Sequence, residues 1–112
     1  MKLTEIIFYV KDLNKAIDFY LDLDFKVVNR GETYTSLSIP DESIYLSLNS
    51  DEKYMQKRGC GVFVFTAENI EPLRRYYKTI FDNGISVLNK EKWGTYFSVT
   101  DLDGNKLEIV EG

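Results

Sequence analysis

The sequence contains no histidine, and this absence excludes more chemistry than any other feature of the composition. Without an imidazole, the chain cannot build a Ser-His-Asp or Cys-His nucleophilic site, a histidine general base or a histidine-bearing zinc site. Its single cysteine, Cys60, excludes an internal disulfide and a thiolate zinc site, and favours a reducing, cytoplasmic compartment. Carboxylates, tyrosines, lysines and Cys60 remain for acid–base work.

The chain also lacks an excess of positive charge and any long apolar run. Its 14 basic and 18 acidic residues give a formal net charge of −4, so we expect no nucleic-acid partner. No apolar stretch approaches the ~18 residues of a membrane span, and the first residues lack the basic start and apolar core of a signal peptide. With 112 residues, the chain is one domain or two small modules that share a core.

An internal repeat of about half the chain is the main feature that is present. Thr33-Tyr34-Thr35-Ser36-Leu37 resembles Thr95-Tyr96-Phe97-Ser98-Val99, and the order of expected elements is βαβββ in both halves. We therefore predict a first module over residues 1–50, a polar linker over 51–61 and a second module over 62–112. The expected strands are 3–10, 25–28, 33–39 and 43–48 in the first module, and 62–65, 85–88, 95–99 and 106–110 in the second.

One helix is expected in each module. Asp12 is a typical N-cap before the helical apolar spacing of residues 13–21. Asn69 is expected to cap the second helix, which has Pro72 in its first turn and ends before Gly84. Its apolar stripe comprises Leu73, Tyr76, Tyr77, Ile80 and Phe81. Asp103-Gly104 predicts a hairpin turn between the last two strands.

Strand alternation divides each sheet into an apolar face under its helix and a mixed face opposite. We expect the mixed face to carry Glu5, Ile7, Tyr9, Tyr34, Ser36, Tyr45 and Ser47 in the first module, and Val62, Val64, Tyr96, Ser98, Glu108 and Val110 in the second. A concave face of aromatics, small hydroxyls and carboxylates is typical of a small-molecule pocket, and equally of a half-wet subunit interface.

Two motifs make the chain resemble the vicinal oxygen chelate superfamily, which includes glyoxalases, fosfomycin-resistance proteins, bleomycin-binding proteins and extradiol dioxygenases. The opening runs Tyr9-Val10-Lys11-Asp12-Leu13, then Ala16-Ile17-Asp18-Phe19-Tyr20. The ending runs Trp93-Gly94 with Phe97, then residues 101–110, DLDGNKLEIV. Leu102 stands where that family usually has proline. The resemblance spans essentially the whole chain.

The resemblance implies an α+β fold of two βαβββ modules whose curved mixed sheets surround a cavity, and a homodimer. It places the family's four metal-ligand positions on Glu5, Ser47, Val62 and Glu108. Metal-dependent members usually have histidine at the first and third of these. Only Glu108 fits that pattern directly, so we expect no cofactor, although two carboxylates could hold a hard divalent metal weakly.

Three functions stay open on this basis. The first is metal-free binding of a small aromatic or cationic molecule by Tyr9, Tyr34, Tyr45, Ser47, Trp93 and Tyr96. The second is a glyoxalase-like lyase or isomerase, in which Glu108 and Glu5 act as an acid–base pair or as weak metal ligands. The third is a regulatory or purely structural dimer.

Overall fold

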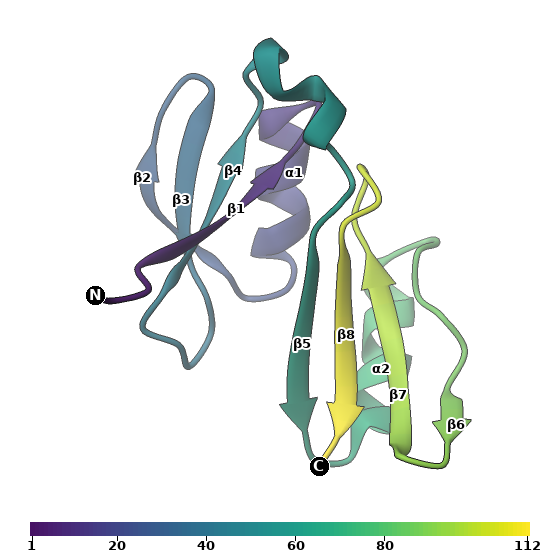
Figure 1. The fold of residues 1–112 in the computed structure, drawn as a ribbon. Helices are drawn as coiled ribbons and strands as arrows, with labels where there is room; N and C mark the ends of the chain where they lie inside the picture. Colours follow the sequence, from purple (N-terminus) through teal and green to yellow (C-terminus); the bar gives the residue numbers. More distant parts are fainter. The chain divides into compact units, whose positions relative to one another are not determined.

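The computed structural model describes every residue, 1–112, and follows one order of elements twice (Figure 1). The chain divides into two compact units: Met1–Gly61 with Leu102–Asn105, and Val62–Asp101 with Lys106–Gly112. Each unit has a four-stranded sheet with parallel and antiparallel neighbours, and one α-helix. The predicted α+β architecture of two βαβββ modules is therefore confirmed. No helix has the length and apolar character needed to span a membrane.

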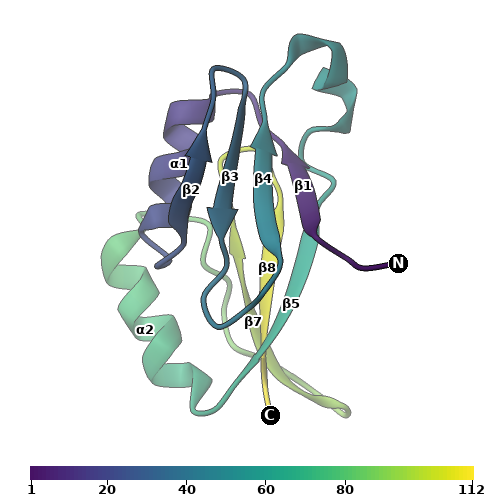
Figure 2. The ribbon, with the colours of Figure 1, turned by 90° about the vertical axis from the view of Figure 1, so that its left-hand side faces the viewer.

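The first unit consists of β1 (Glu5–Tyr9), α1 (Leu13–Leu21), β2 (Lys26–Arg30), β3 (Tyr34–Ser38), β4 (Tyr45–Asn49) and the 3-10 helix η1 (Glu52–Lys57). The strand order is β1-β4-β3-β2, with β1 parallel to β4. Strand β1 is thus an edge strand, and η1 follows β4 (Figure 2).

Helix α1 forms where the sequence predicts it. The side chain of Asp12 accepts a hydrogen bond from the backbone N–H of Lys15 at 3.1 Å, which confirms the expected N-cap. The helix buries one apolar stripe against the sheet face formed by alternate residues of β1, β3 and β4, and the sheet's opposite face is left to polar residues. The buried core includes Phe8, Ala16, Ile17, Tyr20, Leu37, Leu46 and Leu48.

The second unit consists of β5 (Val62–Ala67), α2 (Ile70–Ile80), β6 (Asn89–Glu91), β7 (Gly94–Thr100) and β8 (Lys106–Glu111), with strand order β5-β8-β7-β6. The strand expected over residues 85–88 was wrong. Ile85 forms only an isolated bridge to Val99, and the strand that pairs with β7 is β6. The position of β6 is therefore determined by its pairing with β7 and not by local β-propensity.

For α2, the expected N-cap position is confirmed, but the expected capping bond and one member of the apolar stripe were wrong. Asn69 occupies the N-cap position but has a left-handed backbone (φ 51°) and makes no side-chain capping bond. The backbone N–H of Ile70 instead donates to the carboxylate of Glu111 at 3.2 Å, so a residue far along the chain supplies the cap. Tyr76 was placed on the apolar stripe, yet it is 58% exposed.

Hydrogen bonds join the segment after β4 to the rest of the first unit. The guanidinium Nε of Arg58 donates to the backbone carbonyl of Val10 at 3.0 Å, and the N–H of Gly61 donates to Oδ1 of Asn105 at 2.8 Å. The turn at residues 102–105, between β7 and β8, also belongs to this unit: Asp103 accepts from the N–H of Lys11 at 2.8 Å. Gly104 there has φ 99°, as a tight hairpin turn requires.

Candidate functional site

The register of the first sheet aligns polar side chains in rows on the face opposite α1. Residues paired directly across neighbouring strands point to the same side of a sheet. Three rows result: Glu5 with Tyr45 and Ser38, Ile7 with Ser47 and Ser36, and Tyr9 with Asn49 and Tyr34. The predicted mixed face of this module is therefore confirmed, and it holds five of the eight predicted site residues.

A carboxylate with two hydroxyl donors lies on this face, at the start of β1. Oε2 of Glu5 accepts hydrogen bonds from the hydroxyl of Tyr34 at 2.8 Å and from that of Ser47 at 2.5 Å. The hydroxyls of Ser36 and Ser47 are 3.0 Å apart, which extends the network to β3. Ser47 is fully buried, whereas Glu5 is exposed. The network therefore holds an accessible carboxylate in one orientation.

These hydrogen bonds favour the charged form of Glu5. Donation from Ser47, and then from Tyr34, lowers the pKa of Glu5 below its ordinary value of 4.5, and burial opposes this only in part. Burial first, and then the interaction with Glu5, raises the pKa of Tyr34, so its hydroxyl remains a donor. Glu5 forms no ion pair with a lysine or arginine. The face thus presents a negative charge that no cation of the chain neutralises.

Ser47→Ala tests this network through its pH dependence. Because the folded-state pKa of Glu5 is lowered, the stability that the hydrogen bond supplies is fully present above pH 4.5 and is lost as the pH falls through the folded-state pKa. We expect the variant to have a higher Glu5 pKa by carboxyl-carbon NMR, and a loss of stability that shrinks in acid. Ser38→Ala, which removes a hydroxyl of the same face not bonded to Glu5, should leave that pKa unchanged.

An aromatic and cationic cluster lies at the Tyr9 end of the face. The rings of Tyr9 and Tyr54 are 5.2 Å apart, and the ammonium of Lys57 lies 5.5 Å from the centre of each. Tyr54 and Lys57 both project from η1, three residues apart. Sequence reasoning missed these two residues, because it treated residues 51–61 as a polar linker. The (i, i+3) spacing of an aromatic and a lysine was the available signal.

In the second unit, Tyr96 and Glu108 share one face of the sheet, and Trp93 lies in the turn between β6 and β7. Glu108 pairs with Val64 and with Ser98, and Tyr96 pairs with Val110. Trp93 stacks on Tyr96 with ring centres 5.3 Å apart and planes at 18°, and Trp93 is 65% exposed. This unit therefore adds a carboxylate and an open aromatic surface, but Glu108 makes no hydrogen bond like those of Glu5.

The four positions at which the resemblance to the superfamily led us to expect metal ligands hold few donor atoms. The first unit supplies the carboxylate of Glu5 and the hydroxyl of Ser47, and the second supplies the carboxylate of Glu108 beside the apolar Val62. No group of three or more histidine, cysteine, aspartate or glutamate side chains comes together anywhere in the chain.

Two βαβββ modules, each with a helix on one sheet face and a mixed polar and apolar face opposite, define a class of paired-module α+β proteins. The family model described as the Glyoxalase/Bleomycin resistance protein/Dioxygenase superfamily matches residues 2–109, and the chain belongs to that superfamily. The resemblance seen in the sequence is thereby confirmed.

Individual relatives are distant. Metallothiol transferase FosB of Staphylococcus epidermidis is 28% identical over 118 residues, which cover 96% of this chain and 79% of FosB. A bleomycin-binding protein solved with bleomycin superposes with a TM-score of 0.75 at 18% identity, covering 100% of this chain and 98% of that one. Lactoylglutathione lyase from Agrobacterium tumefaciens gives 0.74 at 20% identity, covering 99% and 93%. At these identities, the two structures show a shared fold.

Proposed function

We propose that this protein binds a small molecule through a basic group of the ligand, which contacts the carboxylate of Glu5. The observation that carries the proposal is the fixed, accessible and unneutralised charge of Glu5 between the hydroxyls of Tyr34 and Ser47. A preorganised anion attracts a cationic group without the cost of first orienting the carboxylate. The overall charge of −4 favours the same ligand charge.

The surroundings of Glu5 favour an aromatic or cationic ligand. Tyr9, Tyr34 and Tyr45 lie in the same three rows, so a flat molecule on this face meets ring surfaces as well as charge. Trp93 and Tyr96 form a second aromatic surface, which we assign to ligand stacking. That a bleomycin-binding protein shares this fold supports small-molecule binding as a use of the architecture.

We also infer that binding needs no resident metal ion. In the first unit, one oxygen of Glu5 already accepts two hydroxyl hydrogen bonds, and the hydroxyl of Ser47 acts as a donor to it. In the second unit, Val62 has no ligand atom. Hard divalent cations need several oxygen ligands, so these residues do not fit a resident metal site.

Glu5→Gln tests the proposal with phenethylammonium as the probe. Glutamine keeps an oxygen that can accept from Tyr34 and Ser47, but it removes the charge. We expect binding to weaken about tenfold, the ~1.4 kcal/mol of a charge-assisted contact, in calorimetry and in ligand-induced thermal stabilisation. The fluorescence of Trp93, the only tryptophan, reports separately whether the probe binds to the aromatic surface of the second unit.

Glu42→Gln is the matched control, because it removes one exposed carboxylate from the turn before β4. It should bind the probe as the wild-type protein does. Equal affinity of Glu5→Gln and wild type for phenethylammonium, or equal wild-type affinity for the uncharged 2-phenylethanol, would contradict the assigned role of Glu5.

A further inference from the structure

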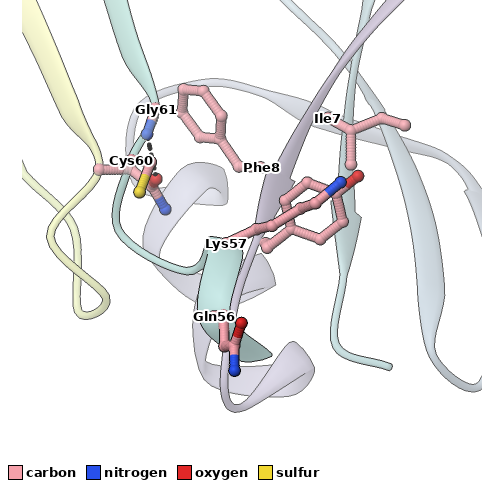
Figure 3. A pocket seen from close by; sticks show the side chains of 8 residues that line it. Ile7, Phe8, Gln56, Lys57, Cys60 and Gly61 are labelled. Atoms are coloured by element: carbon pink, nitrogen blue, oxygen red, sulfur yellow. Dashed lines mark hydrogen bonds between the residues drawn. The ribbon is translucent and has the colours of Figure 1, made fainter. Parts of the chain in front are cut away.

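A cavity of about 340 Å³ lies between β1 and η1, wholly within the first unit. Its volume is sufficient for an aromatic ring with one polar substituent. Figure 3 shows Lys57 reaching from η1 toward Ile7, with Cys60 and Gly61 near Phe8. The lining residues are Ile7, Phe8, Tyr9, Gln56, Lys57, Cys60, Gly61 and Asn105. We call this space the β1–η1 cavity.

The charge and chemistry of its walls select one kind of group. Lys57 is the only charged residue of the lining, and its ammonium forms no ion pair. The rings of Tyr9 and Tyr54 hold that ammonium in place while it stays exposed. The amide of Gln56 adds a neutral donor, and Ile7, Phe8 and Tyr9 supply apolar walls. An aromatic carboxylate matches this lining, because its carboxylate can bind Lys57 and Gln56 while its ring contacts the apolar side chains.

The β1–η1 cavity lies along the free edge of β1, so Phe8 lines it from the buried side of the sheet and two other lining residues share the sheet face of Glu5. Ile7 and Tyr9 line the cavity, and both point to the same side of β1 as Glu5. Tyr9 lies four positions after Glu5 along the strand, which corresponds to ~13 Å at ~3.3 Å per residue. The negative carboxylate of Glu5 and the positive ammonium of Lys57, which lies over Tyr9, are therefore near opposite ends of β1. A small molecule can span this distance.

We propose that the β1–η1 cavity binds a carboxylate-bearing aromatic group, and that this group is the acidic end of the ligand whose basic end contacts Glu5. The ligand is therefore amphoteric, with its positive and negative groups ~13 Å apart. The second half of this inference rests on the proposed function, whereas the carboxylate site itself does not.

The single cysteine makes the cavity accessible to experiment, because an uncharged thiol reagent reports only on Cys60. We would follow the rate of alkylation of Cys60 by N-ethylmaleimide in the presence of three probes. They are 4′-(aminomethyl)biphenyl-4-carboxylate, biphenyl-4-carboxylate and 4-(aminomethyl)biphenyl. We expect both carboxylates to slow alkylation and the amphoteric probe to do so at the lowest concentration.

Lys57→Gln should weaken protection by either carboxylate about tenfold, as expected for loss of a charge-assisted contact. Lys53→Gln is the matched control: this lysine lies over Tyr54 and pairs with Asp51, but it does not line the cavity. In Lys53→Gln, the carboxylate probes should protect Cys60 from alkylation as well as they do in the wild-type protein. Alkylation rates without probe identify any variant whose cavity is itself disturbed.

The outcomes separate the two proposals. If the amphoteric probe loses affinity in both Lys57→Gln and Glu5→Gln, the inference is supported in full. If the carboxylates protect Cys60 through Lys57 but Glu5→Gln changes nothing, the proposed function and the single amphoteric ligand fail, and the carboxylate site stands. If no carboxylate protects Cys60 while the amine binds through Glu5, the inference is overturned and the proposed function stands.

Discussion

Tyr20→Ala is expected to lower the free energy of unfolding by about 3–5 kcal/mol, the usual cost of removing a large buried aromatic side chain. Tyr20 is fully buried at the end of α1. Its ring lies 5.2 Å from that of Phe19, 5.3 Å from that of Phe25 and 6.3 Å from that of Phe8. Alanine leaves a cavity that these rings cannot fill without leaving their own positions.

Chemical denaturation monitored by circular dichroism measures this loss. Tyr76→Ala is the matched control, since it truncates an exposed tyrosine of α2 and should change stability by no more than about 0.5 kcal/mol. If Tyr20→Ala does not fold, Tyr20→Leu keeps part of the volume and should give a smaller, measurable loss. Similar losses in Tyr20→Ala and Tyr76→Ala would contradict the packing described for the core of the first unit.

Tyr20 also shows why the fold could be predicted from the sequence. Its place on the buried side of α1 follows from the spacing of Leu13, Ala16, Ile17 and Tyr20 after the Asp12 cap, which are features within one helix. The face of each strand follows likewise from alternation over a few residues. Local periodicity determines these features, so no distant contact had to be known.

The features that the sequence did not predict depend on contacts between distant residues. Glu111 caps α2 from the far end of β8, and the position of β6 depends on its register with β7. Neither partner can be recognised from the residues near Asn69 or Ile85. Local propensity therefore placed the cap on the nearest polar residue and the strand on the nearest β-branched run.

The candidate site combines both cases. Alternation placed Glu5, Tyr34 and Ser47 on one face, but their shared hydrogen bonds depend on the register of three strands. The β1–η1 cavity was missed altogether, because it requires η1 to fold back against β1 from about 45 residues away in the sequence. The role of Lys57 could therefore be inferred only from the three-dimensional structure.

Gly61→Ala is expected to cost about 2–3 kcal/mol of stability through overpacking and a weakened hydrogen bond. A Cβ at this position would overlap the ring of Phe8 and lie 2.9 Å from Oδ1 of Asn105. Phe8 is only 3% exposed and packs beside Tyr20, so its ring has little room to move. The hydrogen bond from Gly61 to Asn105 must also lengthen if the amide moves away.

A double-mutant cycle with Phe8→Leu identifies the cause. If the overlap with the ring is the main cost, Gly61→Ala should be less destabilising in the Phe8→Leu background, giving a coupling energy of about 1 kcal/mol or more. Cys60→Ser, at the exposed neighbouring position, should be near neutral. Strict additivity of Gly61→Ala and Phe8→Leu would contradict this explanation. Phe8, Gly61 and Asn105 all line the β1–η1 cavity, so Gly61→Ala should also alter the alkylation rate of Cys60. The packing of this core therefore helps to determine the shape of the proposed carboxylate site.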